Sequence, residues 1–173
     1  MEKTVQRFRK ILVANRGEIA VRVLRAISEL NIKTVAIYSY EDRYSPHRYK
    51  ADEAYQIGAA DNPLKPYLDI DAIIDLAKSK QVDAIHPGYG FLSENVHFVR
   101  KCAEAGIVFI GPRPEVMERL GDKVQAKKVA REVKVPLIPD SKVELKELVQ
   151  VVSEANRIGF PVMLKAAAGG GGR

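Results

Sequence analysis

Lys10-Ile11-Leu12-Val13-Ala14-Asn15-Arg16-Gly17-Glu18 joins a short apolar run to the beginning of a helix. The run from residue 10 to 15 is typical of a buried strand. From Gly17 and Glu18 onward, apolar residues recur every three or four positions, as in an amphipathic helix: Ile19, Val23, Leu24, Ile27 and Leu30. A buried strand followed by such a helix is half of a βαβ unit and predicts a parallel sheet.

The same alternation continues along the chain. We expect further strands at residues 33–38, 52–57, 82–86 and 107–110, and a loop at 39–50. We expect helices at 69–80 and 93–106, with Asp69 and Ser93 as their N-caps and Gly106 at the end of the second. Residues 1–112 are therefore predicted to form an α/β domain, an open parallel sheet with helices on both faces.

The pattern becomes more helical after Gly111-Pro112-Arg113-Pro114. We expect helices at about 122–133 and up to Ile158, and then a buried strand at Phe160–Leu164. Residues 113–173 are predicted to be the beginning of a second domain, of which this chain contains only a part.

A lysine and a glycine run close the sequence. Lys165 precedes Gly169, Gly170, Gly171 and Gly172. Backbone N–H groups of successive glycines can surround an anion, and a neighbouring lysine adds a cation, so the segment suits a polyphosphate. A glycine linker is the alternative. Lys123 lies in the first turn of a predicted helix, where a cation is unfavourable unless an anion is nearby.

Composition narrows the class of protein. The chain has 173 residues, a net charge of +6, a hydrophobic content of 46% and one cysteine, Cys102. The basic residues are interleaved with acids and no RNA-binding aromatic signature is present, so we expect no nucleic-acid partner. No apolar run is long enough for a membrane span. A single cysteine fits a reducing compartment, and we expect the cytoplasm, or the mitochondrial matrix if a transit peptide was removed.

The turn after the first strand does not match the dinucleotide fingerprint. It lacks G-x-G-x-x-G, and Arg16 stands where a pyrophosphate would need space. Glu41 and Asp42 follow the second strand, where an acid that binds ribose would lie. A dinucleotide-binding oxidoreductase module therefore remains an alternative, and a non-catalytic interaction domain is another.

A second dense block is His86-Pro87-Gly88-Tyr89-Gly90-Phe91-Leu92-Ser93-Glu94-Asn95. Its glycines allow a loop to approach a ligand closely and to present a phenol and a carboxylate. His86 is read either as a metal ligand or base, or as a hydrogen-bonded histidine at a strand end. No second His or Cys stands at ligand spacing, so we predict no metal site.

Together these blocks resemble the N-terminal part of the biotin carboxylase family of ATP-grasp enzymes. The resemblance covers residues 8–173 and rests on segments in a fixed order: 14–20, 51–54, 86–95, 109–112, 121–123 and 165–173. Residues 40–43 and 47–55 look most like the pyruvate carboxylase branch. The acetyl-CoA and acyl-CoA carboxylase branches remain alternatives.

The resemblance implies a reaction in which ATP and bicarbonate, with Mg²⁺, form carboxyphosphate and ADP, and biotin on a carrier domain is then carboxylated. By the same resemblance, the ATP-binding residues are Lys123, Lys165, Gly169, Gly170, Gly171 and Gly172. Tyr89, Gly90 and Glu94 border the bicarbonate and biotin pocket.

The resemblance also implies partners. Arg25 and Glu29 match positions of the family's dimer interface, so the full-length protein is expected to be a homo-oligomer that works with a biotin carboxyl carrier domain. The catalytic residues and the carboxylates that bind Mg²⁺ fall beyond residue 173 in the family. This chain alone is therefore expected to be inactive, with no metal ligands of its own.

Overall fold

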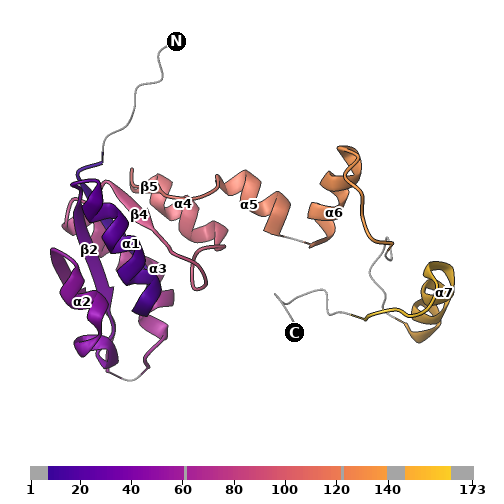
Figure 1. Ribbon diagram of the computed structural model, residues 1–173, viewed down its shortest axis with the longest axis horizontal. Coiled ribbons are helices and arrows are strands. Elements are labelled where there is room, and N and C mark those ends of the chain that lie inside the picture. The colour runs from indigo at the N-terminus through magenta and orange to yellow at the C-terminus, as the bar shows by residue number, and fades with distance from the viewer. Residues whose placement is uncertain (1–7, 61, 122, 140–146, 165–173) are drawn as a thin grey trace, which may run out of the picture. The chain divides into compact units, whose positions relative to one another are not determined.

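The computed structural model describes residues 8–60, 62–121, 123–139 and 147–164 (Figure 1). The chain divides into two compact units, Met1–Glu118 and Arg119–Arg173. The first unit contains the sheet.

In the described part of the chain, five strands form one sheet in which every neighbouring pair is parallel, in the order β3-β2-β1-β4-β5. The strands are β1 (Lys10–Val13), β2 (Lys33–Tyr38), β3 (Glu53–Gln56), β4 (Ala84–His86) and β5 (Val108–Phe109). The predicted parallel α/β sheet is confirmed.

The order of the strands creates a switch point at β1. The chain runs from β1 outward to β2 and β3, and then crosses back so that β4 pairs with the other side of β1. In open parallel sheets, ligands bind outside the carboxyl ends of the strands at such a point, because the connecting loops diverge there. The ends of β1 and β4 are therefore the expected place for a site.

Helices cover both faces of the sheet, as predicted (Figure 1). On one face, Ile11 and Val13 of β1 pack with Leu24 and Ile27 of α1 (Gly17–Glu29). On the other face, the alternate strand residue Leu12 joins a core that also contains residues of α3 (Ile70–Ser79) and α4 (Val96–Glu104). Successive side chains of a strand point to opposite faces, so one short apolar run supplies both cores.

Two predicted N-caps had different outcomes. Asp69 caps α3 by accepting a hydrogen bond from the backbone N–H of Ala72 at 3.0 Å, as predicted. The prediction for Ser93 is wrong, because α4 begins after Asn95, whose side chain accepts from the N–H of Phe98 at 2.9 Å. The N–H of Ser93 instead donates to Gly90 O in a turn that precedes the helix.

The prediction that residues 39–50 form a loop is also wrong. The segment forms a 3₁₀ helix, η1 (Glu41–Tyr44), and a short helix, α2 (Pro46–Lys50). Pro46 stands at the first helical position, where a missing N–H costs nothing. A second 3₁₀ helix, η2 (Lys65–Leu68), precedes α3.

The helical region after the sheet begins earlier than expected. α5 (Pro114–Gly121) starts within the segment that we read as a boundary, again with a proline at its first position. α6 (Lys123–Glu132) and α7 (Leu148–Ile158) correspond to the two predicted helices. Among the described residues, no helix has the length and apolar character that a membrane crossing needs.

The strand predicted at Phe160–Leu164 is not formed. These residues are irregular, and Phe160, Met163 and Leu164 are exposed. A buried strand needs a neighbour that accepts its backbone hydrogen bonds, and none pairs with this segment in the described parts of the chain. The apolar run identified a segment suited to burial, but burial depends on a partner.

Candidate functional site

The candidate site lies at the carboxyl ends of β1 and β4, where the turn Asn15–Gly17 meets the loop His86–Gly90. The side-chain amide of Asn15 donates hydrogen bonds to the backbone oxygens of Pro87, at 2.7 Å, and Tyr89, at 2.9 Å. Its own oxygen accepts from the N–H of Arg16 at 2.8 Å. A fully buried side chain thus joins two loops more than 70 residues apart in sequence.

Three residues that we assigned to a bicarbonate and biotin pocket lie in one segment between β4 and α4. The side chains of Tyr89 and Glu94 are exposed, with Tyr89 66% accessible, and a Cβ added at Gly90 would meet no atom within 4 Å. Tyr89, Gly90 and Glu94 are therefore all exposed in the connection that leaves the carboxyl end of β4.

An ion pair joins the turn after β1 to the 3₁₀ helix η1 that follows β2. The Arg16 guanidinium contacts the Asp42 carboxylate at two points, Nε to Oδ2 and Nη2 to Oδ1, each at 2.6 Å. The hydroxyl of Tyr67 donates to Asp42 Oδ2 at 2.7 Å and accepts from the N–H of Ser39. Both carboxylate oxygens of Asp42 therefore accept hydrogen bonds, Oδ2 from Arg16 and Tyr67 and Oδ1 from Arg16.

These contacts determine the charge states. Burial alone would raise the pKa of Asp42, but the hydrogen bonds from Arg16 and Tyr67 outweigh it and hold that pKa below its usual value. The bond to Asp42 raises the pKa of Arg16. Burial, and then the hydrogen bond to Asp42, raises the pKa of Tyr67, so its phenol stays protonated. The site contains a charged pair and a neutral phenol.

The ion pair also argues against the dinucleotide alternative. Asp42 is the acid after β2 that could have bound a ribose, and its oxygens are occupied by Arg16 and Tyr67. Arg16 remains in the turn after β1, as the sequence indicated. Neither a pyrophosphate nor a ribose finds its usual partners there.

His47 is buried beneath the same turn. Its Nε2 lies 3.1 Å from the oxygen of Ile37, which can only accept, so Nε2 carries the proton. Its Nδ1 accepts from the N–H of Gly17 at 3.3 Å and lies 2.9 Å from Ser45 Oγ. Burial lowers the pKa of His47, which fixes the ring in the neutral form. The imidazole supports the turn and faces no solvent.

His86 ends β4, and its Nδ1 accepts from the N–H of Gly88 at 3.0 Å. Burial lowers its pKa, so the ring is neutral. The hydrogen-bonded strand-end interpretation fits this geometry. Across the described ranges, no group of three or more His, Cys, Asp or Glu residues could hold a metal ion.

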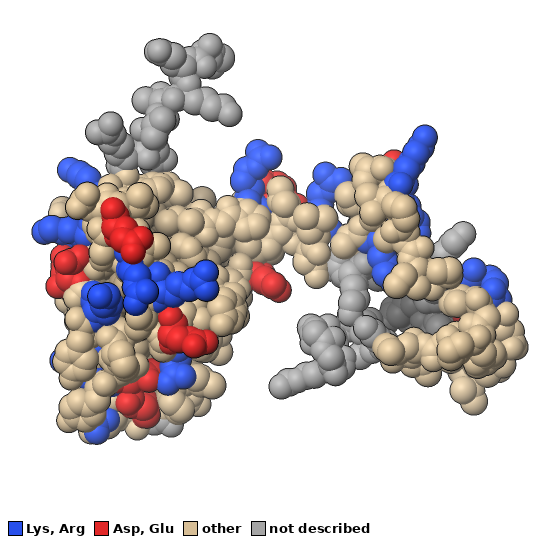
Figure 2. Space-filling view, viewed as in Figure 1, with Lys and Arg blue, Asp and Glu red and all other residues tan. Residues whose placement is uncertain are grey.

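The other predicted residues lie elsewhere. Arg25 and Glu29 are exposed on α1. Figure 2 shows basic and acidic side chains interspersed on the visible face of the first unit, with no single-sign stripe. Lys123 begins α6, and the structure describes its backbone only. Lys165 and Gly169, Gly170, Gly171 and Gly172 fall outside the described residues.

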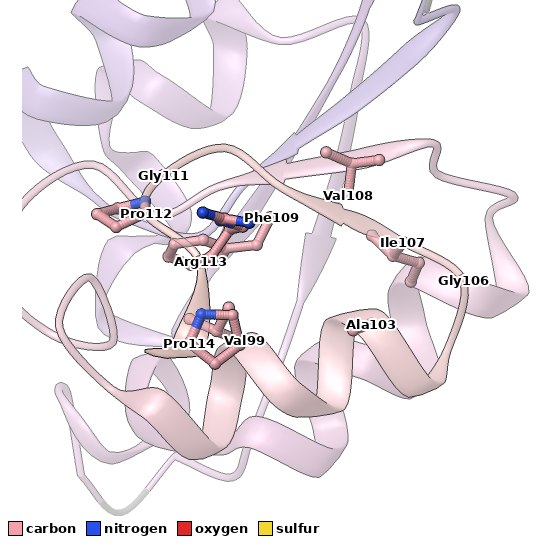
Figure 3. A pocket seen from close by; sticks show the side chains of 10 residues that line it. All are labelled: Val99, Ala103, Gly106, Ile107, Val108, Phe109, Gly111, Pro112, Arg113 and Pro114. Atoms are coloured by element: carbon pink, nitrogen blue, oxygen red, sulfur yellow. The ribbon is translucent and has the colours of Figure 1, made fainter. Parts of the chain in front are cut away.

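A separate hollow of about 350 Å³ lies between α4, β5 and the start of α5 (Figure 3). Its lining is mostly apolar, including Val99, Ile107 and Phe109, and Arg113 is the charged residue among those that line it. It contains none of the predicted site residues.

Sequence reasoning missed the contacts that organise the site. Asn15 and Tyr67 were not singled out, and Asp42 was considered only as a ligand for ribose. The sequence did offer one signal for these residues: Asn15 and Asp42 both follow strands that end at the same edge of a parallel sheet, where sites are expected. Their partners depend on which strands are neighbours.

An open parallel sheet with a glycine-rich loop and buried polar contacts at its switch point defines an α/β ligand-binding domain. Residues 7–117 match the family model described as biotin carboxylase, N-terminal domain, so the chain belongs to the biotin carboxylase family. Residues 122–173 match the family model described as carbamoyl-phosphate synthase L chain, ATP binding domain. The second unit is therefore similar to the beginning of an ATP binding domain.

Known relatives agree with this assignment. Over 170 residues, or 97% of this chain, 57% are identical to pyruvate carboxylase of Bacillus subtilis. Over 166 residues, or 95% of the chain, 55% are identical to biotin carboxylase of Halalkalibacterium halodurans, of which 36% is covered. The chain spans 15% of the length of the Bacillus enzyme.

A solved structure is similar over nearly the whole chain. It is the biotin carboxylase domain dimer of the Hydrogenobacter thermophilus 2-oxoglutarate carboxylase, in complex with MgADP, ADP and bicarbonate. The TM-score is 0.91 at 54% sequence identity, with 97% of this chain and 37% of that chain covered.

Proposed function

We propose that this chain is the N-terminal part of the biotin carboxylase component of a pyruvate carboxylase-like enzyme. The longer polypeptide that contains it, called here the full-length enzyme, transfers the γ-phosphate of ATP to bicarbonate. The resulting carboxyphosphate supplies the carboxyl group that is attached to biotin, with release of phosphate.

The observation that carries this proposal is the position of Tyr89, Gly90 and Glu94. All three are exposed and belong to the connection that leaves the carboxyl end of β4, beside the switch point of the sheet, where the fold favours ligand binding. The loop before them is held from beneath by Asn15, so Tyr89 faces solvent from an anchored backbone. We assign these three residues to the bicarbonate and biotin pocket.

We assign the ATP contacts to the second unit. Lys123 and Lys165 supply cations, and the glycine run Gly169–Gly172 supplies backbone N–H donors for the phosphates. Support comes from the match of residues 122–173 to an ATP binding domain, and from the related biotin carboxylase domain that was solved with MgADP. We assign no Mg²⁺ ligand in this chain and expect those carboxylates beyond residue 173.

Partners and location are part of the same proposal. Arg25 and Glu29 belong to a homodimer interface, and the related domain was solved as a dimer. A biotin carboxyl carrier domain presents the biotin. Pyruvate is the final acceptor that we propose, on the identity with the Bacillus enzyme. We propose a cytoplasmic or mitochondrial-matrix location, and we place the end of the first domain at about residue 112.

Kinetics on the full-length enzyme test the proposal. Wild type should cleave ATP in a bicarbonate-dependent way that free biotin stimulates. Tyr89→Ala should raise the KM for free biotin about tenfold, the effect of losing one well-placed contact. Tyr44→Ala, which removes another exposed tyrosine, should leave that KM unchanged. If the KM for free biotin is the same in Tyr89→Ala and wild type, the assignment of Tyr89 to the pocket is wrong.

A further inference from the structure

We infer that Asn15 is a positioning residue that holds Tyr89 in place for the carboxylation of biotin. The inference rests on the proposed function, because it concerns the pocket to which Tyr89 was assigned. Asn15 itself is fully buried, which keeps it out of reach of a ligand, so it acts through the loop above it.

The contacts of Asn15 use both ends of its amide. The nitrogen faces two carbonyl oxygens, those of Pro87 and Tyr89, and the oxygen faces the N–H of Arg16. Carbonyls only accept and a backbone N–H only donates, so this arrangement determines which end of the amide is nitrogen. Both N–H groups and the oxygen of the buried amide therefore have hydrogen-bond partners.

The loop needs such support because its backbone is unusual. Gly88, Gly90 and Phe91 have φ angles of 66°, 71° and 43°. A left-handed backbone is costly for a bulky residue such as Phe91, and it persists only where surrounding contacts impose it. Asn15 holds the loop before that position. Phe91 itself is held by its ring, which stacks on the ring of Tyr67 with 5.4 Å between the centroids.

Gly88 completes the arrangement. A Cβ at this position would lie 2.6 Å from the amide nitrogen of Asn15 and 2.8 Å from Ile19 Cγ2. Only a glycine lets the loop descend far enough for the carbonyls on either side to reach Asn15. A change at Gly88 therefore disturbs the same contact from the loop side.

The consequence for the reaction is a preorganised phenol. Tyr89 O is fixed at 2.9 Å from Asn15, which limits the directions in which the exposed Tyr89 side chain can leave the backbone. A ligand that meets Tyr89 then does not have to order the loop first. Loss of Asn15 should weaken the binding of biotin and leave the ATP contacts, which we assign to the second unit, intact.

Two readouts on the full-length enzyme test the inference. In Asn15→Ala, hydrogen exchange at the amides of residues 88–91 should become at least about tenfold faster, and the KM for free biotin should rise about tenfold. The KM for ATP should stay within about twofold, because a positioning effect is confined to its loop.

Gly88→Ala provides a second variant in case Asn15→Ala does not fold, since its Cβ displaces the amide while Asn15 remains. Gly106→Ala is the matched control: Gly106 has nearly the same φ, 69°, but a Cβ there meets no atom within 4 Å. Gly88→Ala should reproduce the rise in the KM for biotin, and Gly106→Ala should not.

An unchanged KM for biotin in both Asn15→Ala and Gly88→Ala would overturn the inference. So would a parallel rise in the KM for biotin and for ATP, since that is the result of a general structural defect. Failure of the proposed function looks different, because Tyr89→Ala would then leave the KM for biotin unchanged as well. If Tyr89→Ala raises it and the other two variants do not, only the role of Asn15 is lost.

Discussion

Arg16 and Asp42 are joined by two hydrogen bonds of 2.6 Å, across 26 residues of sequence, at the carboxyl end of the sheet. The Asp42 side chain is 8% exposed and that of Arg16 is 38% exposed. The pair links the turn after β1 to the 3₁₀ helix after β2, and Tyr67 joins it from η2. Three connections of the sheet therefore meet at one carboxylate.

Removing that carboxylate should destabilise the first unit. Asp42→Ala leaves the Arg16 charge and the Tyr67 hydroxyl without their acceptor, and we expect a loss of about 2–3 kcal/mol in the free energy of unfolding. Urea unfolding followed by circular dichroism measures it. Glu118→Ala breaks an exposed ion pair with Arg100 and should cost under about 1 kcal/mol. Equal effects of the two changes would contradict the structure.

Asp42 should also make stability depend on pH. Its pKa is lowered in the folded state, so its contribution is fully present above the pKa of the unfolded state, about 4. That contribution is lost as the pH falls through the folded pKa. Unfolding free energies between about pH 5 and pH 2 should fall more steeply in wild type than in Asp42→Asn. Parallel curves would mean that Asp42 is not paired.

His47 predicts a second dependence at higher pH. Its pKa is lowered by burial, so folding favours the neutral ring and the unfolded state binds more protons. Stability should therefore decline as the pH falls below about 6.5. Gln at this position retains a donor and an acceptor without titrating. The difference in unfolding free energy between His47→Gln and wild type should narrow at low pH, and a constant difference would refute this assignment.

Lys165 should matter for ATP and little for folding. In the full-length enzyme, Lys165→Ala should reduce bicarbonate-dependent ATP cleavage by about tenfold or more, since it removes the charge-assisted phosphate contact that we propose for this lysine. Lys78→Ala, at an exposed position of α3, is the control and should not. Steady-state kinetics with ATP as the varied substrate distinguishes them. Wild-type kinetics in Lys165→Ala would argue for a plain glycine linker at the end of this sequence.

Arg25 should contribute to assembly. Arg25→Ala in the full-length enzyme should raise the dimer dissociation constant by about tenfold, within the range of a central interface residue. Analytical ultracentrifugation gives that constant. Arg22→Ala removes a second exposed arginine from α1 and serves as the control. If both variants dissociate like wild type, Arg25 lies outside the interface.

Local rules explain where prediction succeeded. The strands and the helices α1, α3 and α4 follow from the spacing of apolar residues, and the cap at Asp69 follows from its position before a periodic run. These signals succeed because each depends on residues within one or two turns of chain. They fail where burial needs a distant partner, as at Phe160–Leu164, and where a turn displaces a cap, as at Ser93.

The sequence by itself determined the class of fold, the family and the block that supplies Tyr89, Gly90 and Glu94. Only the tertiary structure decided what holds that block. Asn15 meets Tyr89, and Arg16 meets Asp42, because β1 lies between β2 and β4 and the three strands end at one edge. Strand order is a property of the whole sheet, set by how all its helices and strands bury their apolar faces together. Strand order decides which loops are neighbours and can form contacts, and no local pattern in the sequence encodes those contacts.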